Sequence, residues 1–163
     1  MFLYLMRHGI AEDFDPSRHR NDSERELTAE GRDKLKKQAH GLATLDLGVE
    51  LIVCSPYARA RATADIARSA FKNVELIESD TLVPHAMPKV TLHGLSKLPI
   101  SHAVMLVGHE PHLSALTATV LGHETLQVEM KKGALVGLEL DRFEPRAGRL
   151  HFLLPPKVLR SIS

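Results

Sequence analysis

The sequence predicts an α/β protein of three layers, with helices on both faces of a mostly parallel central sheet. Two features predict this class. Short apolar segments typical of strands alternate along the chain with segments whose apolar residues recur at helical spacing. The strand segments are apolar at consecutive positions, as expected for strands buried on both faces. The chain has 163 residues and shows no repeat or linker, so we expect one domain over residues 1–163.

The first part of the chain predicts a strand, a loop and a helix. Residues 2–6 are apolar or aromatic and form the expected first strand. Residues 10–26 are rich in charge and are expected to form an exposed loop. Thr28 is a suitable N-cap, and Glu30 follows in the first turn, where an acidic side chain favours the helix dipole. An apolar stripe at helical spacing continues as far as Leu45.

The middle of the chain repeats this order. We expect a buried strand at residues 51–54, which Ser55-Pro56 ends, and then a helix over about 57–70. A short third strand is expected at residues 74–77. Residues 79–101 hold several prolines and glycines, and they predict one short helix.

The last part of the chain contains the most continuous apolar strand, at residues 103–107. A helix is expected over about 112–121, followed by two strands near 134–140 and 149–154. Pro155-Pro156 ends the last strand, because proline lacks the N–H that a sheet needs.

The composition gives no sign of a nucleic-acid or membrane partner. The formal net charge is +1, so any attraction to anions must be local. No stretch approaches the roughly 20 apolar residues of a membrane span. The six apolar residues at the N-terminus are too few for a signal-peptide core. The one cysteine, Cys54, cannot form an internal disulfide, and we expect a cytoplasmic protein.

Three of the predicted strands end in residues that suit phosphate chemistry. Arg7 and His8 follow the first strand, Arg59 lies one turn into the helix after the second, and His109 follows the strand at 103–107. In open α/β sheets, ligands bind outside the carboxyl ends of the strands. We therefore expect these four side chains to converge on one pocket, although they are up to about a hundred positions apart.

Such a pocket has the parts that phosphoryl transfer needs. Two arginines offer paired donors for phosphate oxygens, and a neutral imidazole nitrogen is a competent nucleophile. A second histidine can donate a hydrogen bond to the oxygens as charge shifts. We expect Gly9 to let the backbone turn beside His8 without a side chain that crowds the phosphate.

The ordered motifs around these residues resemble those of the histidine phosphatase superfamily, which has the phosphoglycerate mutase-like fold. The resemblance covers essentially the whole chain, and its motifs are Leu5–Gly9, Glu24–Gly31, Ser55–Ala64 and Val107–Pro111. Within the superfamily, the short length and the stretch Gly108–Ser114 resemble the SixA-like phosphohistidine phosphatases.

The resemblance implies roles for the candidate residues. His8 would accept the phosphoryl group, and Arg7, Arg59 and His109 would form the rest of the catalytic pocket, with Arg7, Gly9, Arg59 and His109 binding the substrate. No metal or cofactor would be needed. The partner would be a phosphorylated protein or a small phosphate-bearing substrate, and phosphate or sulfate is expected to occupy the site.

One departure from the superfamily concerns the acid that protonates the leaving group. Many members place a glutamate after the third strand, whereas here Asp80 and His85 are the nearest substitutes. General acid catalysis contributes on the order of 100- to 10,000-fold, and an alkoxide needs it more than imidazole does. The sequence therefore favours a phosphohistidine on a protein. A phosphomonoesterase of a small metabolite, with Asp80 or His85 as the acid, is the alternative.

Two further residues have open roles. Arg25 precedes a helix, where it either reaches the phosphate or pairs with neighbouring acids, and we expect the ion pair. Glu110 either orients His8 or His109, or caps the helix that begins near Pro111.

Three rival functions are disfavoured, and one is left open. Four residues separate Cys54 from Arg59 and six separate it from Arg61, so the Cys-x5-Arg motif of cysteine phosphatases is absent. A metal site built on His109 and His112 is not expected, because no zincin motif accompanies them. Nor does the sequence contain a nucleotide-binding glycine motif. The alternative that stays open is a non-catalytic phosphoprotein-binding module. The presence of His8 argues against it, because such a module would not need a nucleophile.

Overall fold

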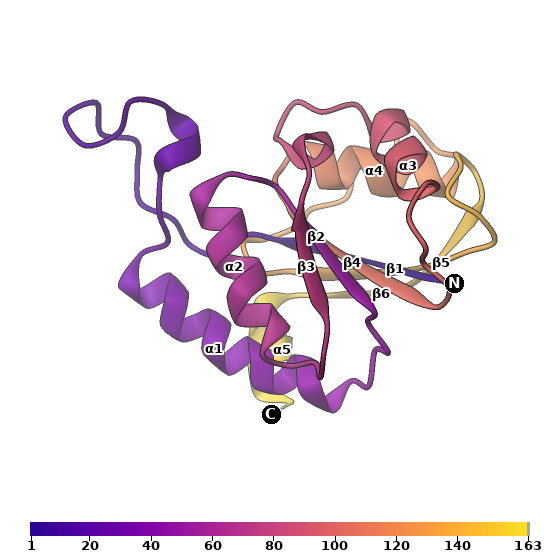
Figure 1. Ribbon diagram of the computed structural model, residues 1–163, viewed down its shortest axis with the longest axis horizontal. Coiled ribbons are helices and arrows are strands. Elements are labelled where there is room, and N and C mark those ends of the chain that lie inside the picture. Colours follow the sequence, from indigo (N-terminus) through magenta and orange to yellow (C-terminus); the bar gives the residue numbers. More distant parts are fainter. Residues whose placement is uncertain (163) are drawn as a thin grey trace.

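The protein is described from a computed structural model, which covers residues 1–162 and shows one sheet of six strands in the order β3-β2-β4-β1-β5-β6 (Figure 1). The strands are β1 Phe2–Arg7, β2 Leu51–Cys54, β3 Glu75–Glu78, β4 Ala103–Gly108, β5 Leu135–Leu140 and β6 Gly148–Leu154. The first four run parallel to one another, β5 is antiparallel to β1, and β6 is antiparallel to β5. The sheet is therefore mixed, with a parallel half that carries β1, β2 and β4.

Helices cover both faces of this sheet, as the sequence predicts (Figure 1). On one face lie α1 Ala29–Thr44, α2 Ala58–Arg68 and the short α5 Pro156–Ser161. On the other lie α3 Pro88–Leu95 and α4 His112–Leu121. Two 3-10 turns, η1 Asp22–Glu24 and η2 Asp80–Leu82, lie in the connections. The three-layer α/β/α architecture is confirmed.

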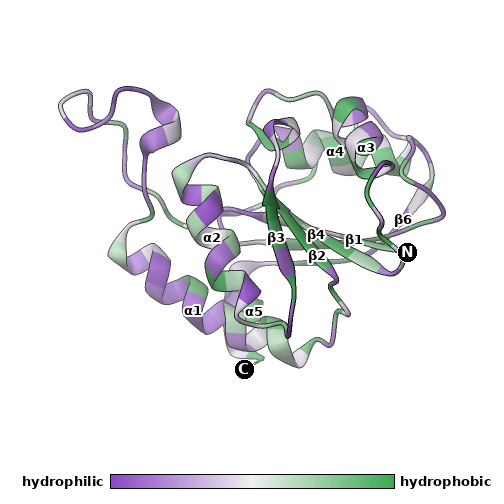
Figure 2. Cartoon of the chain, viewed as in Figure 1, coloured by the Kyte–Doolittle hydropathy of each residue, from purple (hydrophilic) through white to green (hydrophobic). Residues whose placement is uncertain are grey.

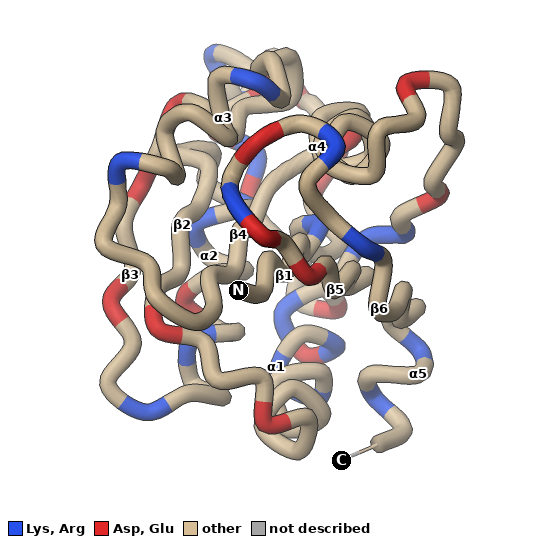
Figure 3. Tube along the Cα trace, turned by 90° about the vertical axis from the view of Figure 1, so that its right-hand side faces the viewer, with Lys and Arg blue, Asp and Glu red and all other residues tan. Residues whose placement is uncertain are grey.

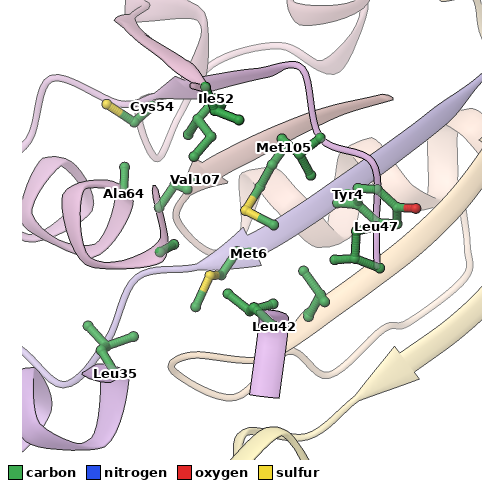
Figure 4. Packing of buried hydrophobic residues seen from close by; sticks show 14 of the residues in the cluster. Tyr4, Met6, Leu35, Leu42, Leu47, Ile52, Cys54, Ala64, Met105 and Val107 are labelled. Carbon is green, nitrogen blue, oxygen red and sulfur yellow. The ribbon is translucent and has the colours of Figure 1, made fainter. Parts of the chain in front are cut away.

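The sheet holds the two halves of the core together. Side chains that alternate along β1 enter different clusters: Leu3 and Leu5 face α3 and α4, whereas Tyr4 and Met6 face α1 and α2. Figure 2 shows the apolar strands between helices of mixed polarity. Figure 4 shows Met6 of β1 among the buried apolar residues of the cluster that faces α1 and α2. Both faces are buried, and the strands are apolar at consecutive positions for this reason.

Most of the expected elements are present within about two residues of their predicted bounds. Thr28 is the N-cap of α1, and its hydroxyl accepts the N–H of Gly31 at 3.0 Å. The sequence did not predict the helix α5. Pro156 occupies its first turn, and Leu159 is wholly buried against α1. The backbone of α5 lies close against α1: a Cβ on Gly41 of α1 would lie 1.9 Å from the Leu159 carbonyl oxygen.

Seen from the side where the chain begins, Lys and Arg residues are interspersed with Asp and Glu residues along the trace (Figure 3). Within residues 1–162, the structure has no helix that is both long enough and apolar enough to span a membrane.

Candidate active site

The carboxyl ends of β1, β2 and β4 lie side by side and bring the predicted site residues together. Arg7 of β1 pairs with Gly108 of β4, and the next residue, His8, donates its backbone N–H to the Gly108 carbonyl at 3.0 Å. The rings of His8 and His109 lie 5.0 Å apart, centroid to centroid. Arg59 reaches the same place from α2. The structure therefore gathers all four residues at one edge of the sheet.

His8 is held in the form that a nucleophile requires. The side chain is only 5% exposed. Its Nδ1 lies 2.7 Å from the carbonyl oxygen of Gly9, and its Nε2 lies 3.2 Å from Nε of Arg59, which always carries a proton. The Nδ1 atom is thus the donor to Gly9, and Nε2 keeps its lone pair. Burial, together with the charges of Arg59 and Arg7, lowers the pKa of His8 to about 3, so the ring is neutral near pH 7.

Arg59 is fixed from several directions. Its side chain is 3% exposed, and its guanidinium lies 5.2 Å from the centre of the Tyr57 ring. One terminal nitrogen donates to the backbone carbonyl of Asp22 and the other to the Asp22 carboxylate, each at 2.7 Å. Asp22 thus occupies the paired donors that Arg59 would offer to a phosphate.

Asp22 is a member of the site that the sequence did not reveal. It begins η1, in the loop that the sequence predicts to be merely exposed. Arg25 binds the other oxygen of its carboxylate at 2.8 Å, so Arg25 forms the expected ion pair with a neighbouring acid. Partial burial acts to raise the pKa of Asp22, but the hydrogen bonds and charges of Arg59 and Arg25 outweigh it and lower the pKa. Asp22 is therefore an anion near neutral pH.

Two buried nitrogens of the pocket residues have no partner in the part of the chain that the structure describes. They are Nε of Arg7 and Nδ1 of His109. A terminal nitrogen of Arg7 is bound to the Met130 carbonyl at 2.7 Å, and Nε2 of His109 lies 2.9 Å from the Ser55 hydroxyl. Buried polar groups are nearly always satisfied in folded proteins. Two orphaned nitrogens beside His8 therefore indicate a place for an anionic ligand.

Gly9 also packs against the core. A Cβ at this position would lie 2.6 Å from Cδ1 of Leu35, a core residue of α1, so the Leu35 side chain would have to shift to admit one. The N–H of Gly9 is also engaged, since it donates to the hydroxyl of Thr63 at 3.1 Å. That hydroxyl in turn donates to the carbonyl oxygen of Arg59 at 2.7 Å. Thr63 thus links the His8 segment to α2.

The candidate acids lie outside this network. Asp80 and His85 are exposed, and within residues 1–162 neither forms a hydrogen bond or an ion pair with the four pocket residues. Glu110 binds the hydroxyl of Ser114 in the first turn of α4, instead of His8 or His109. Burial raises its pKa, although the charge of Arg7 opposes this effect.

The remaining reactive residues have structural surroundings. Cys54 is wholly buried in the core, and burial raises the pKa of its thiol to about 11. His112 is buried, and its Nε2 bonds the Thr91 hydroxyl at 2.9 Å. Residues 1–162 contain no group of three or more histidine, cysteine or acidic side chains that is placed to hold a metal ion.

Comparison with known proteins agrees with these motifs. The family profile of the histidine phosphatase superfamily (branch 1) matches residues 3–87. An uncharacterized protein of Picosynechococcus sp. is 33% identical over 141 residues, which cover 85% of this chain and 84% of that protein.

Solved structures share the fold over nearly the whole chain. The putative phosphohistidine phosphatase SixA from Agrobacterium tumefaciens is 27% identical, with a TM-score of 0.79 over 95% of this chain and 97% of that one. The protein histidine phosphatase SixA complexed with tungstate is 22% identical, with a TM-score of 0.81 over 96% and 98%. An alpha-ribazole phosphatase from Shigella flexneri, 17% identical, has a TM-score of 0.76 over 96% and 97%. The resemblance to the SixA-like branch is confirmed. The same fold also occurs in a phosphatase that is named for a different substrate, alpha-ribazole phosphatase.

Proposed function

Because this chain belongs to the histidine phosphatase superfamily, we propose that it removes the phosphoryl group from phosphohistidine on a protein, through a covalent intermediate on His8. The observation that carries the proposal is the state of the His8 ring. Its Nδ1–H is held by Gly9, and its lone pair on Nε2 faces the guanidinium of Arg59 at 3.2 Å. A neutral nitrogen aimed into a cationic pocket is the arrangement that attack on phosphorus requires.

The chemistry proceeds in two displacements. The lone pair of His8 Nε2 forms a bond to phosphorus while the P–N bond of the substrate breaks, and the substrate ring, already protonated on its other nitrogen, leaves as a neutral imidazole with that electron pair. A water molecule then attacks phosphorus and releases a proton to solvent, the P–N bond to His8 breaks, and the electron pair returns to Nε2. Arg7, Arg59 and His109 donate to the phosphoryl oxygens in both steps, where fixed donors stabilise the developing charge.

The leaving group supports phosphohistidine as the substrate. Asp22 is ionised and bound to two arginines, so it has no proton to give. Asp80 and His85 are exposed and make no bond to the pocket residues. An imidazole, with an ordinary pKa near 6.5, leaves with little help from an acid. An alkoxide would leave poorly from such a site.

The surface beside the pocket supports a macromolecular partner. A groove of about 610 Å³ is lined by residues of α4, by residues 124–129, and by Glu110 and Pro111, which follow His109 in the chain. The Met130 carbonyl that binds Arg7 lies at the end of the same segment. A polypeptide that carries phosphohistidine has room to lie there. The likeness to the putative phosphohistidine phosphatase SixA from Agrobacterium tumefaciens supports the same class of substrate.

The test compares substrates at equal enzyme concentration. The purified protein is given a phosphohistidine-bearing protein and, in parallel, sugar, nucleotide and aryl phosphates. We expect turnover on phosphohistidine to be the fastest by orders of magnitude, with acid-labile label on His8 after a quench. His8→Ala should abolish both signals, while His123→Ala, at an exposed position, is the matched control. Faster turnover of a metabolite would favour the phosphomonoesterase, and binding without turnover would favour the binding module.

A further inference from the structure

Ser55 lies wholly buried between the carboxyl ends of β2 and β4. Its backbone N–H donates to the carbonyl oxygen of Val107, which precedes the end of β4, at 2.9 Å. Its hydroxyl lies 2.9 Å from Nε2 of His109. Because the backbone bond fixes Ser55 relative to β4, the hydroxyl is held in a set position against the His109 ring.

The direction of this hydrogen bond follows from the partners of the hydroxyl. The oxygen of Ser55 accepts the backbone N–H of Tyr57 at 3.3 Å. Within residues 1–162, the one acceptor placed for the hydroxyl proton is Nε2 of His109. If His109 donated instead, a buried hydroxyl proton would have no acceptor, which is costly. The proton of Ser55 therefore points to Nε2, which must carry a lone pair.

A neutral histidine whose Nε2 is an acceptor carries its proton on Nδ1. In His109, Nδ1 is the buried nitrogen that has no partner in the described part of the chain. The ring is 1% exposed and packs 5.0 Å from the ring of His8 on one side and 5.0 Å from that of Tyr57 on another. The ring that carries the unpartnered N–H therefore lies beside the ring of the nucleophile.

We propose that Ser55 is a positioning residue that fixes the Nδ1–H tautomer of His109, so that this N–H donates to the phosphoryl group during transfer. The opposite tautomer would present a lone pair to an anion and repel it. Burial and the nearby positive charges lower the pKa of His109 to about 2, so the ring has one proton and its location decides whether the pocket attracts the oxygens. The role in transfer rests on the function proposed above.

The tautomer is measurable without any substrate. In the ¹⁵N-labelled full-length protein, long-range ¹H–¹⁵N correlation spectra distinguish a protonated from an unprotonated ring nitrogen. The spectrum of His109→Gln identifies the His109 signals by their loss. At pH 7.5 we expect the Nδ1–H form of His109 in the wild type. A wild-type spectrum with the proton on Nε2, or on both nitrogens, would overturn the proposal, whatever substrate the protein acts on.

Variants then test whether Ser55 is the cause. In Ser55→Ala we expect the His109 signals to shift toward the Nε2–H form, and kcat to fall by about 10- to 100-fold, as for a weakened donor to an oxyanion. Ser55→Thr keeps a hydroxyl and should keep both the tautomer and most of the activity. Thr117→Ala removes a buried hydroxyl that binds the Leu113 carbonyl within α4, and it should change neither.

Several outcomes of this comparison are decisive. An unchanged His109 tautomer in a folded Ser55→Ala protein would show that Ser55 does not set it, and the inference would be wrong. If Ser55→Ala unfolds, Ser55→Cys replaces it, since the thiol has a similar size but donates weakly. If the tautomer shifts in Ser55→Ala but the wild type has no phosphatase activity, Ser55 still sets the tautomer of His109, and the proposed function is contradicted instead.

Discussion

Arg59 binds His8 and Asp22 with different nitrogens of one guanidinium: its Nε donates to His8 at 3.2 Å, and both terminal nitrogens donate to Asp22 at 2.7 Å. The arginine that would hold a phosphoryl group is therefore already bound to a carboxylate. Because that carboxylate comes from the 10–26 loop, the loop and the phosphate would share the same donors.

Asp22→Asn should strengthen the binding of inorganic phosphate. The substitution removes a negative charge that a phosphate must approach, while an amide oxygen remains to accept from Arg59. We expect the inhibition constant of phosphate to fall by about 2- to 5-fold, the size of a partly exposed ion pair. Competitive inhibition of the phosphatase reaction by phosphate measures this constant. Glu26 belongs to the same loop, and its exposed carboxylate pairs with Arg32. Glu26→Gln should therefore leave the inhibition constant of phosphate unchanged. Weaker phosphate binding in Asp22→Asn would show that the carboxylate supports the site.

The buried histidines should make the fold sensitive to acid. Burial lowers the pKa of His8 to about 3 and that of His109 to about 2, whereas both rings titrate near 6.5 in the unfolded chain. The unfolded state therefore binds more protons below pH 6.5. The stability due to these neutral rings is fully present above pH 6.5 and is lost as the pH falls toward the folded-state values.

Urea unfolding at pH 7.5 and pH 4.5 measures this loss. Between pH 7.5 and pH 4.5, we expect protonation of each of these two histidines in the unfolded chain to lower the free energy of unfolding by about 3 kcal/mol. In His109→Gln the difference between the two pH values should shrink by about that amount. His123→Gln, at an exposed position, should leave the difference as it is in the wild type. Equal pH sensitivity of His109→Gln and the wild type would contradict the prediction.

Gly9 and Leu35 should be coupled in stability. A Cβ on Gly9 would lie 2.6 Å from Cδ1 of Leu35, so Gly9→Ala overpacks the contact between the His8 segment and α1. We expect a loss of about 1–3 kcal/mol. Leu35→Ala alone leaves a cavity and costs about 2–5 kcal/mol. The double variant should be less destabilised than the sum, and urea unfolding of all four proteins gives the coupling energy. Simple additivity would show that the clash is relieved elsewhere.

The positions of Arg7, His8, Arg59 and His109 were predictable from sequence, because each follows a strand whose apolar run is continuous. Parallel strands with both faces buried place their carboxyl ends at one edge, so residues far apart in the chain meet there. The geometry confirms that these four lie together.

Other features depend on contacts that no local pattern encodes. Asp22 is one of several acids in a charged loop, and only its approach to Arg59 singles it out. The sequence predicts Ser55 merely as the end of a strand, yet its hydroxyl meets His109 across two strand ends. The helix α5 is six residues long and depends on the burial of Leu159 against α1. In each case the partner lies more than thirty positions away in the chain.

Thr63 should couple the stability of the fold to the alignment of the nucleophile. Its hydroxyl accepts the N–H of Gly9 at 3.1 Å and donates to the Arg59 carbonyl at 2.7 Å, so one buried group holds both the His8 segment and α2. Thr63→Val keeps the shape but leaves the Gly9 N–H unsatisfied, which costs about 1–3 kcal/mol. Thr63→Ser keeps the hydroxyl and should lose much less. If the link aligns His8 with Arg59, kcat of Thr63→Val should fall several-fold below that of Thr63→Ser at temperatures where both remain folded. Equal kcat values would show that Thr63 stabilises the fold without aligning the site.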